Sequence, residues 1–265
     1  MKLNLVRKLN VGASARYSFR VFLSLLPKPG GFVGVIREHD PTDPGRKTDV
    51  RRLDFDFDGQ LRRDEIIMKG EDPRIFIWNG RACFLTWLAN SNGDWHHWLV
   101  DLDTKFKVQL RIKPWMFHGK NWVPIVCHDR LLILRSLDPL VVLEVDDKTG
   151  ICRCIHGRLN HQTVGEYRGG GRAVCESGMI SGFGHRTRHA DEHTVFHYSI
   201  DTKTWIIRRR DIQVLGVSGM GIIDPTSQWN EYVACCATKG RWSARQPAVH
   251  GIFRIEEPCV IPSDQ

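Results

Sequence analysis

The sequence predicts an all-β protein, a five-bladed β-propeller with about 50 residues and four strands per blade. The first observation behind this prediction is a unit of polar opening, apolar strand, turn and second apolar strand that recurs along the chain. Its five occurrences open near Phe22, Asp72, Asn121, Gly171 and Asp224. The second observation is a short strand ending in acidic residues, which lies between successive openings. These strands cover residues 51–58, 98–103, 141–147, 196–201 and 252–257.

Local signals within each unit favour strands over helices. Residues 72–88, DPRIFIWNGRACFLTWL, contain a polar opening, an apolar run, an Asn-Gly pair and a second apolar run. Asn-Gly, Asp-Gly and Gly-Gly pairs are typical of hairpin turns, and no long segment has the 3.6-residue apolar period of a helix. We expect residues 1–265 to form one domain, with residues 1–9 adding a strand that closes the ring. The apolar run at 21–26 is short for a signal sequence and is expected to be a strand.

The composition is that of an ordinary soluble protein with a basic surface. The formal net charge is +8 and the isoelectric point is about 9.2, which favours acidic partners such as nucleic acid or phosphate-bearing small molecules. The chain has no recognised nucleic-acid-binding module, which argues against a nucleic-acid partner. The arginines at 208–210 are expected to lie on a solvated surface.

The cysteines and the apolar runs bear on the cellular location of the protein. Eight cysteines are present, none in CxxC spacing, and several lie within apolar runs. They are expected to be small buried hydrophobic residues in a reducing environment. No apolar run reaches the roughly 20 residues that a membrane-spanning helix needs. These features predict a cytoplasmic protein without a membrane span.

Four histidines recur at steps of four, a spacing that would place them on one face of a helix. They are His185, His189, His193 and His197. The repeat pattern instead places His185 at the end of one hairpin and His197 in the following strand. We expect residues 186–194 to form a polar loop between them. On this interpretation the histidines do not form a metal site.

Polar residues that open or follow the predicted first strands would converge at one mouth of a propeller's channel. The candidates are Asp72, Arg74, Lys120, Asn121, Arg168, His185 and Asp224. Arginine and lysine bind phosphate oxygens, so the group suits a phosphorylated sugar. Each residue also has a structural interpretation, since Asp-Pro pairs open turns, Arg74 could form a structural salt bridge, and residues 169–171 could form a bulge.

Asp72 is the strongest candidate for acid–base catalysis. A carboxyl group can protonate a glycosidic oxygen when burial raises its pKa. The neighbouring Glu71 would raise the pKa of Asp72 by like-charge repulsion, whereas Arg74 would lower it. We expect the first effect to make Asp72 a general acid.

Five short motifs carry a resemblance to a known family. They are EDPRIF at 71–76, KNWVPI at 120–125, YRGGGRAV at 167–174, GFGH at 182–185 and DPTS at 224–227. In their order and spacing they resemble the mannoside phosphorylases of glycoside hydrolase family 130 and the related β-1,2-mannosyltransferases, which are five-bladed propellers. The resemblance covers about residues 70 to 230. One departure is Gly171, where the family usually has threonine.

The resemblance implies roles for individual residues. Asp72 would be the single general acid or base of an inverting reaction, without a nucleophilic carboxylate. Arg74, Lys120, Arg168 and His185 would surround a phosphate. Asn121 would contact sugar or phosphate, and Asp224 would bind mannose hydroxyls. No metal and no cofactor is implied.

The sequence therefore favours a glycosyltransferase or glycoside phosphorylase that acts on mannosides through a sugar-phosphate or nucleotide-sugar donor. Transfer, phosphorolysis and hydrolysis stay open at this point, as does the oligomeric state. The alternative is a catalytically inactive propeller that binds glycan or protein. A nucleic-acid binder is a third hypothesis, which the net charge alone motivates.

Overall fold

A computed structural model describes nine ranges of the chain. They are residues 1–12, 19–39, 48–89, 94–112, 120–159, 165–189, 192–217, 220–238 and 248–256. All regular elements in these ranges are β-strands, which confirms the all-β class. Over the same ranges, no helix is long and apolar enough to cross a bilayer.

The strands form four sheets. The first sheet contains β2 (Phe19–Lys28), β3 (Gly31–His39), β4 (Thr48–Asp56) and β5 (Leu61–Lys69). The second contains β6 (Glu71–Trp78), β7 (Arg81–Ala89), β8 (Trp95–Asp101) and β9 (Lys107–Gln109). The third contains β10 (Arg111–Ile112), β11 (Val123–Cys127), β12 (Arg130–Leu137), β13 (Leu140–Val145) and β14 (Ile151–His156).

The fourth sheet has ten strands and comes from both ends of the chain. Its members are β1 (Lys2–Leu9), β15 (Tyr167–Gly169), β16 (Val174–Glu176), β17 (Met179–His189), β18 (Glu192–Asp201), β19 (Ile207–Asp211), β20 (Gln213–Leu215), β21 (Ile222–Trp229), β22 (Tyr232–Thr238) and β23 (Val249–Glu256). Strands β18 and β21 are joined by a single residue pair, His193 with Ile222. Strand β1 pairs with β23, as expected for the added N-terminal strand.

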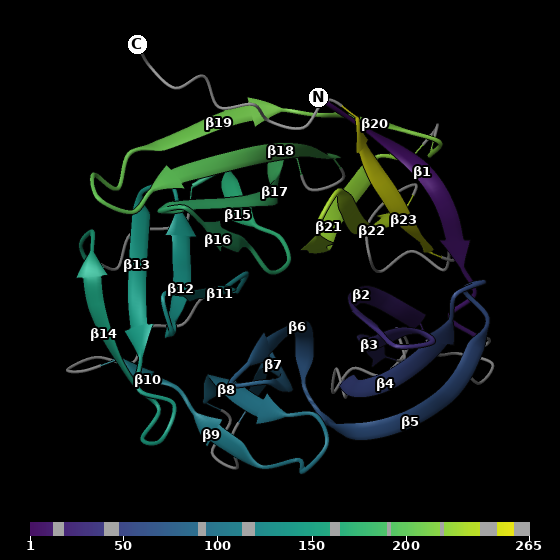
Figure 1. The fold of residues 1–265 in the computed structure, drawn as a ribbon, viewed down its shortest axis with the longest axis horizontal. Helices are drawn as coiled ribbons and strands as arrows, with labels where there is room; N and C mark the ends of the chain where they lie inside the picture. The colour runs from purple at the N-terminus through teal and green to yellow at the C-terminus, as the bar shows by residue number, and fades with distance from the viewer. Residues whose placement is uncertain are drawn as a thin grey trace.

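The sheets are grouped round a common centre (Figure 1). Strands β2, β6, β11 and β21 lie nearest that centre, and β5, β9, β14 and β19 lie at the periphery. Strand β2 contacts both β6 and β21, and β11 contacts β6. Apolar cores fill the spaces between sheets: Phe76 and Leu85 pack with Ile133 and Val141 across the second and third. The number of blades and the closure of the ring stay predictions.

The acidic strand ends have a common structural cause. The carboxylate Oδ1 atoms of Asp101, Asp146 and Asp201 each accept hydrogen bonds from the backbone N–H groups two and three residues later. Aspartate is favoured in this position because its short side chain satisfies the turn's own backbone. The recurring acids therefore close the outer hairpins.

The step of about 50 residues also corresponds to a recurring backbone feature. Phe22, Asp72 and Asn121 have left-handed φ values of 59°, 49° and 65°. Phe22 and Asp72 lie on bulges that interrupt the pairing of β2 with β3 and of β6 with β7. A bulge redirects a side chain out of the regular alternation, and left-handed backbone is costly for residues other than glycine. Three of the five predicted openings thus have the same unusual conformation.

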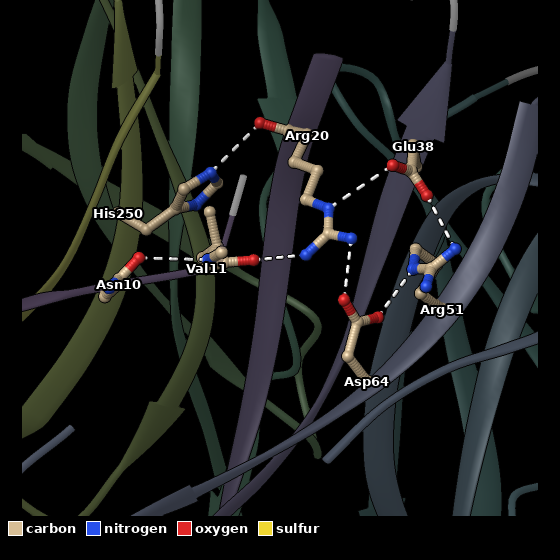
Figure 2. A network of polar contacts seen from close by, with 8 residues as sticks. Asn10, Val11, Arg20, Glu38, Arg51, Asp64 and His250 are labelled. Atoms are coloured by element: carbon tan, nitrogen blue, oxygen red, sulfur yellow. Dashed lines mark hydrogen bonds and ion pairs between the residues drawn. The ribbon is translucent and has the colours of Figure 1, made fainter. Parts of the chain in front are cut away.

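A cluster of four charges, which we name the closed cluster, ties the strands of the first sheet together (Figure 2). Arg20 lies 3.4 Å from Glu38 and 2.7 Å from Asp64, and Arg51 lies 2.8 Å from Glu38 and 2.6 Å from Asp64. Each charge contacts both opposite charges. His250 Nε2 lies 3.1 Å from the backbone oxygen of Arg20, so the cluster also connects to β23.

Two expectations are wrong. The predicted polar loop at 186–194 is largely strand, since β17 continues to His189 and β18 begins at Glu192; the two residues between them lie outside the described ranges. Cys127 and Cys175 form a disulfide between β11 and β16, so they are not free buried thiols. Cys83, Cys152, Cys154, Cys235 and Cys236 are free. The cytoplasmic location stays a prediction.

Candidate active site

Asp72 lies between three sheets at the start of β6. Its bulge sets two residues of β6, Asp72 and Pro73, against one of β7, Thr86, which directs the carboxylate away from the regular ladder. Oδ1 lies 2.9 Å from Arg37 Nη1 on β3, and Oδ2 lies 4.0 Å from Nζ of Lys120, which precedes β11. The backbone conformation thus places one carboxylate between two cations from neighbouring sheets.

The pKa of Asp72 is lowered. Burial raises it, but the positive charges of Arg37, Lys120 and Arg74 outweigh burial. The expectation of a raised pKa is therefore wrong. The physical reason is that Glu71 is itself held by cations, with Oε2 2.6 Å from Lys120 Nζ and 3.2 Å from Arg37 Nη1. Asp72 is a carboxylate at neutral pH.

Lys120 links the acidic pair to an aromatic surface. Its ammonium donates to Glu71 and lies 4.5 Å from the centroid of the Trp87 ring. A cation over an indole face is stabilised by the ring quadrupole. The Lys120 side chain keeps 38% of its surface exposed, whereas that of Glu71 keeps 3%. Lys120 is therefore the accessible cation beside Asp72.

Arg74 connects Asp72 to the fourth sheet. Its Nε donates to the backbone oxygen of Gly170 at 2.8 Å, and its guanidinium carbon lies 5.7 Å from the centroid of the Phe22 ring. Burial lowers the pKa of Arg74, although Asp72 and Asp224 oppose this effect. Arg74 thus has a structural contact, as one interpretation of the sequence proposed, and also supplies positive charge between two carboxylates.

The glycines at 169–171 pack against the central strands. A Cβ on Gly169 would lie 2.3 Å from Cγ2 of Val123, and a Cβ on Gly171 would lie 2.0 Å from the backbone oxygen of Thr226. Both distances are too short for any side chain. The departure at Gly171 from the resembling family's threonine therefore has a packing reason in this chain, because β21 occupies that space.

His185 lies directly opposite Arg168 in the pairing of β17 with β15. The pKa of His185 is lowered to about 4, chiefly by burial; the charges of His193, Arg168 and Arg74 act in the same direction and that of Asp224 opposes them. His185 is therefore neutral at neutral pH. As a neutral imidazole it can accept or donate a hydrogen bond, but it adds no positive charge for a phosphate.

Asp224 contacts two histidines at once. Its Oδ1 lies 3.0 Å from His185 Nδ1 and 3.1 Å from His193 Nδ1. The two imidazole rings are stacked with centroids 4.8 Å apart. Burial raises the pKa of Asp224, but His185, His193 and Arg74 lower it overall. Asp224 is therefore also ionised at neutral pH.

Several buried N–H donors in the two groups of the candidate site lack a hydrogen-bond partner among the described residues. Within the described ranges, no hydrogen bond is made by Nε of Arg37, Nε of Arg168, or Nε1 of Trp87 and of Trp122. All four atoms can only donate. Unpaired buried donors are rare because each loses its hydration. A ligand rich in oxygen acceptors would satisfy them.

The structure brings most of the predicted residues together. A small pocket is lined by Asp72, Arg74, Lys120 and Asn121. Asp224 and His185 form a second group, which Arg74 links to the first. Arg168 lies beside this second group.

Some residues of the site are missing from the predicted set. They are Arg37, Trp87, His97, Trp122 and His193. His193 lies on β18 rather than on the strand of His185, and it comes beside His185 through the register of the hairpin, in which His185 pairs with Val195. Arg37 joins the site because tertiary contact brings β3 beside β6. Trp122 packs against His97 with ring centroids 3.8 Å apart, so one face of its ring is covered.

Comparison with known proteins identifies solved structures that have a similar fold. No family model matches the chain, and no curated protein matches it in sequence. The fold is similar to that of a GDP-Man-dependent mannosyltransferase from Leishmania mexicana, with a TM-score of 0.60, 9% identity, and 97% of this chain and 90% of the other covered. It is also similar to the catalytic domain of a GH62 α-L-arabinofuranosidase from Coprinopsis cinerea, with a TM-score of 0.62, 9% identity, and 96% of each chain covered. A family 117 glycoside hydrolase from Zobellia galactanivorans has a TM-score of 0.60 and 10% identity, with 96% of this chain and 90% of the other covered.

Proposed function

We propose that the chain is a single-domain, five-bladed propeller enzyme that transfers a mannosyl group from a sugar-phosphate or nucleotide-sugar donor to an acceptor hydroxyl. The reaction would be a single displacement with inversion. The named activities of similar folds, glycoside hydrolases and a GDP-Man-dependent mannosyltransferase, support sugar chemistry. The motif resemblance supports mannosides within that chemistry.

The observation that carries the proposal is the ionised Asp72 beside unpartnered N–H donors. Its lowered pKa keeps Asp72 ionised in the free protein, so the carboxylate is able to accept a proton. Transfer to an acceptor hydroxyl needs a base, because the hydroxyl must lose a proton as its oxygen attacks. The donors of Arg37 and Arg168 suit the oxygens of an anionic leaving group.

The proposed step balances with the groups at hand. The acceptor oxygen forms a bond to the anomeric carbon, and its proton passes to Asp72. The bond between that carbon and the donor's phosphate oxygen breaks, and the phosphate leaves with the electron pair. Run in reverse, the same residue would act as the acid of phosphorolysis, so one carboxyl group serves both directions.

The other residues would bind the donor. Lys120 and Arg74 supply positive charge beside Asp72, and Arg168 supplies it near His185. Asn121, whose left-handed backbone places it in the same pocket, would contact sugar or phosphate. Asp224 would accept mannose hydroxyls through whichever carboxylate oxygen the histidines leave available.

The test is turnover with defined donors. The protein is incubated with GDP-mannose or mannose 1-phosphate and a mannobiose acceptor, and released GDP or phosphate is measured with the anomeric configuration of the product. Asp72→Asn should abolish turnover, while Asp103→Asn, a carboxylate whose side chain is 71% exposed, should not. Binding of donor without turnover in the wild-type protein would instead indicate the inactive glycan-binding propeller.

A further inference from the structure

Two imidazoles and a carboxylate converge beside the proposed active site. His185, His193 and Asp224 each offer one ligand atom, and these atoms lie within 4.8 Å of one another. The side chains of His185 and Asp224 are 5% and 3% exposed, and that of His193 is 11% exposed. The group is therefore shielded from bulk water but reachable from one side.

Strand pairing explains why these three side chains meet. Thr187 pairs with His193, and His185 pairs with Val195, so the two histidines are diagonal neighbours on one face of the β17–β18 hairpin. His193 also pairs with Ile222 at the junction with β21. Asp224 follows Ile222 by two residues and lies on the same face of its strand. The arrangement is thus fixed by backbone registers from three strands.

Of the two histidines, His193 makes a hydrogen bond with Asp224 and His185 does not. His193 Nδ1 makes a hydrogen bond with Asp224 Oδ1, at 3.1 Å. His185 Nδ1 lies 3.0 Å from the same oxygen but without hydrogen-bond geometry, and it is buried with no other partner among the described residues. Nδ1 of His185 is therefore a buried ring nitrogen that points to the other two side chains and is not satisfied by a hydrogen bond among the described residues.

We propose that His185, His193 and Asp224 bind a divalent transition-metal ion such as zinc. Two imidazoles and one carboxylate are a donor set that suits zinc, and three protein ligands leave a coordination position open. The nearby charges of Arg74 and Arg168 favour an anionic ligand at that position. The site goes beyond the proposed function, because the chemistry assigned to Asp72 requires no metal.

The first test measures zinc binding without any sugar. Wild-type protein is titrated with zinc by competition against a chromophoric chelator, and metal content is measured after dialysis. We expect one zinc per chain in this site, and at least tenfold weaker binding in His193→Gln and Asp224→Asn. Asp72→Asn should bind zinc as the wild type does, so failure of the metal site and failure of the proposed function are distinguishable.

Two matched controls separate this site from other histidines. His197→Gln changes the same face of the same hairpin, where His197 contacts Ser181, and should leave zinc affinity unchanged. His128→Gln tests the cluster of Cys127, His128 and Cys175 and should also have no effect. Equal zinc affinity in wild type, His193→Gln and Asp224→Asn would overturn the proposal, as would loss of zinc from His128→Gln alone.

A second measurement does not depend on the variants being folded. Cobalt(II) added to the unmodified protein should give visible d–d absorption of an imidazole and carboxylate site, without an intense sulfur-to-metal charge-transfer band. A strong sulfur band, or a spectrum identical to that of free cobalt, contradicts the proposal. In that case Asp224 simply orients the two imidazoles.

Discussion

Two charge clusters start from adjacent residues of β3 and have opposite properties. Glu38 belongs to the closed cluster (Figure 2), and Arg37 contacts Glu71 and Asp72 at the candidate active site. Successive side chains of a strand point to opposite faces, so one strand serves both clusters. We name the second one the site cluster. Its members are Arg37, Glu71, Asp72, Arg74 and Lys120.

The closed cluster satisfies its charges and the site cluster does not. Burial lowers the pKa of Arg51, but Asp64 and Glu38 outweigh burial and the pKa is raised. Arg74 in the site cluster shows the opposite result, a lowered pKa, because its carboxylate neighbours do not compensate for burial. Arg37 also keeps an unpartnered Nε. A cluster built for stability pairs every group, whereas one built for a ligand leaves donors for that ligand.

The largest effect that tests this comparison is expected from Asp72→Asn. The amide keeps the size of the side chain but cannot take a proton, so turnover should fall by roughly 10²–10⁴-fold. The melting temperature should change little. Initial rates with the donors named above and thermal melts of the same samples measure both. Retention of wild-type turnover would remove Asp72 from the mechanism.

The reciprocal change is Arg20→Met in the closed cluster. The Arg20 side chain is 5% exposed and contacts both Glu38 and Asp64. Removing Arg20 leaves Glu38 and Asp64 to share Arg51 and strips a buried cation from both carboxylates, so we expect a loss of about 3 kcal/mol in the free energy of unfolding. Turnover of the folded fraction should persist. Urea unfolding gives the stability, and a loss of turnover without a loss of stability would reverse the roles assigned to the two clusters.

Sequence predicted the inner ends of the strands better than the contacts between sheets. The step of about 50 residues located Phe22, Asp72 and Asn121, because one left-handed backbone conformation recurs at these positions. Asp-Pro and Lys-Asn-Trp motifs located Asp72 and Lys120 for the same local reason.

The pKa of Asp72 could not be predicted, because it depends on a partner distant in sequence. Arg37 precedes Asp72 by 35 positions and approaches it through sheet packing. The disulfide of Cys127 with Cys175, 48 positions apart, escaped prediction for the same reason. His193 escaped prediction because residues 186–194 were expected to form a loop, whereas the pairing of β17 with β18 brings His193 beside His185.

Arg37→Met should change the pH dependence of turnover rather than abolish it. Arg37 is the strongest of the charges that lower the pKa of Asp72, so its removal raises that pKa. A base is lost by protonation as pH falls, and the loss should begin at higher pH in the variant. We expect the acid limb of the kcat/KM profile, where Asp72 becomes protonated, to begin at a higher pH in the variant than in wild type. Arg37→Lys should largely restore the wild-type profile, and identical profiles for all three proteins would contradict the role.

The smallest expected effect is on the pH dependence of the free energy of unfolding. It compares His250, beside the closed cluster, with His185, near the site cluster. Burial lowers the pKa of both His250 and His185 from 6.5 to about 4. The unfolded chain therefore binds protons between these values and the folded chain does not, so the free energy of unfolding falls as pH falls from about 6.5 towards 4. His250→Gln and His185→Gln should each reduce that slope by about 1 kcal/mol per pH unit. Only His185→Gln should also impair turnover, since His250 contacts the backbone of the closed cluster; equal impairment by both would mean that the two clusters are not functionally separate.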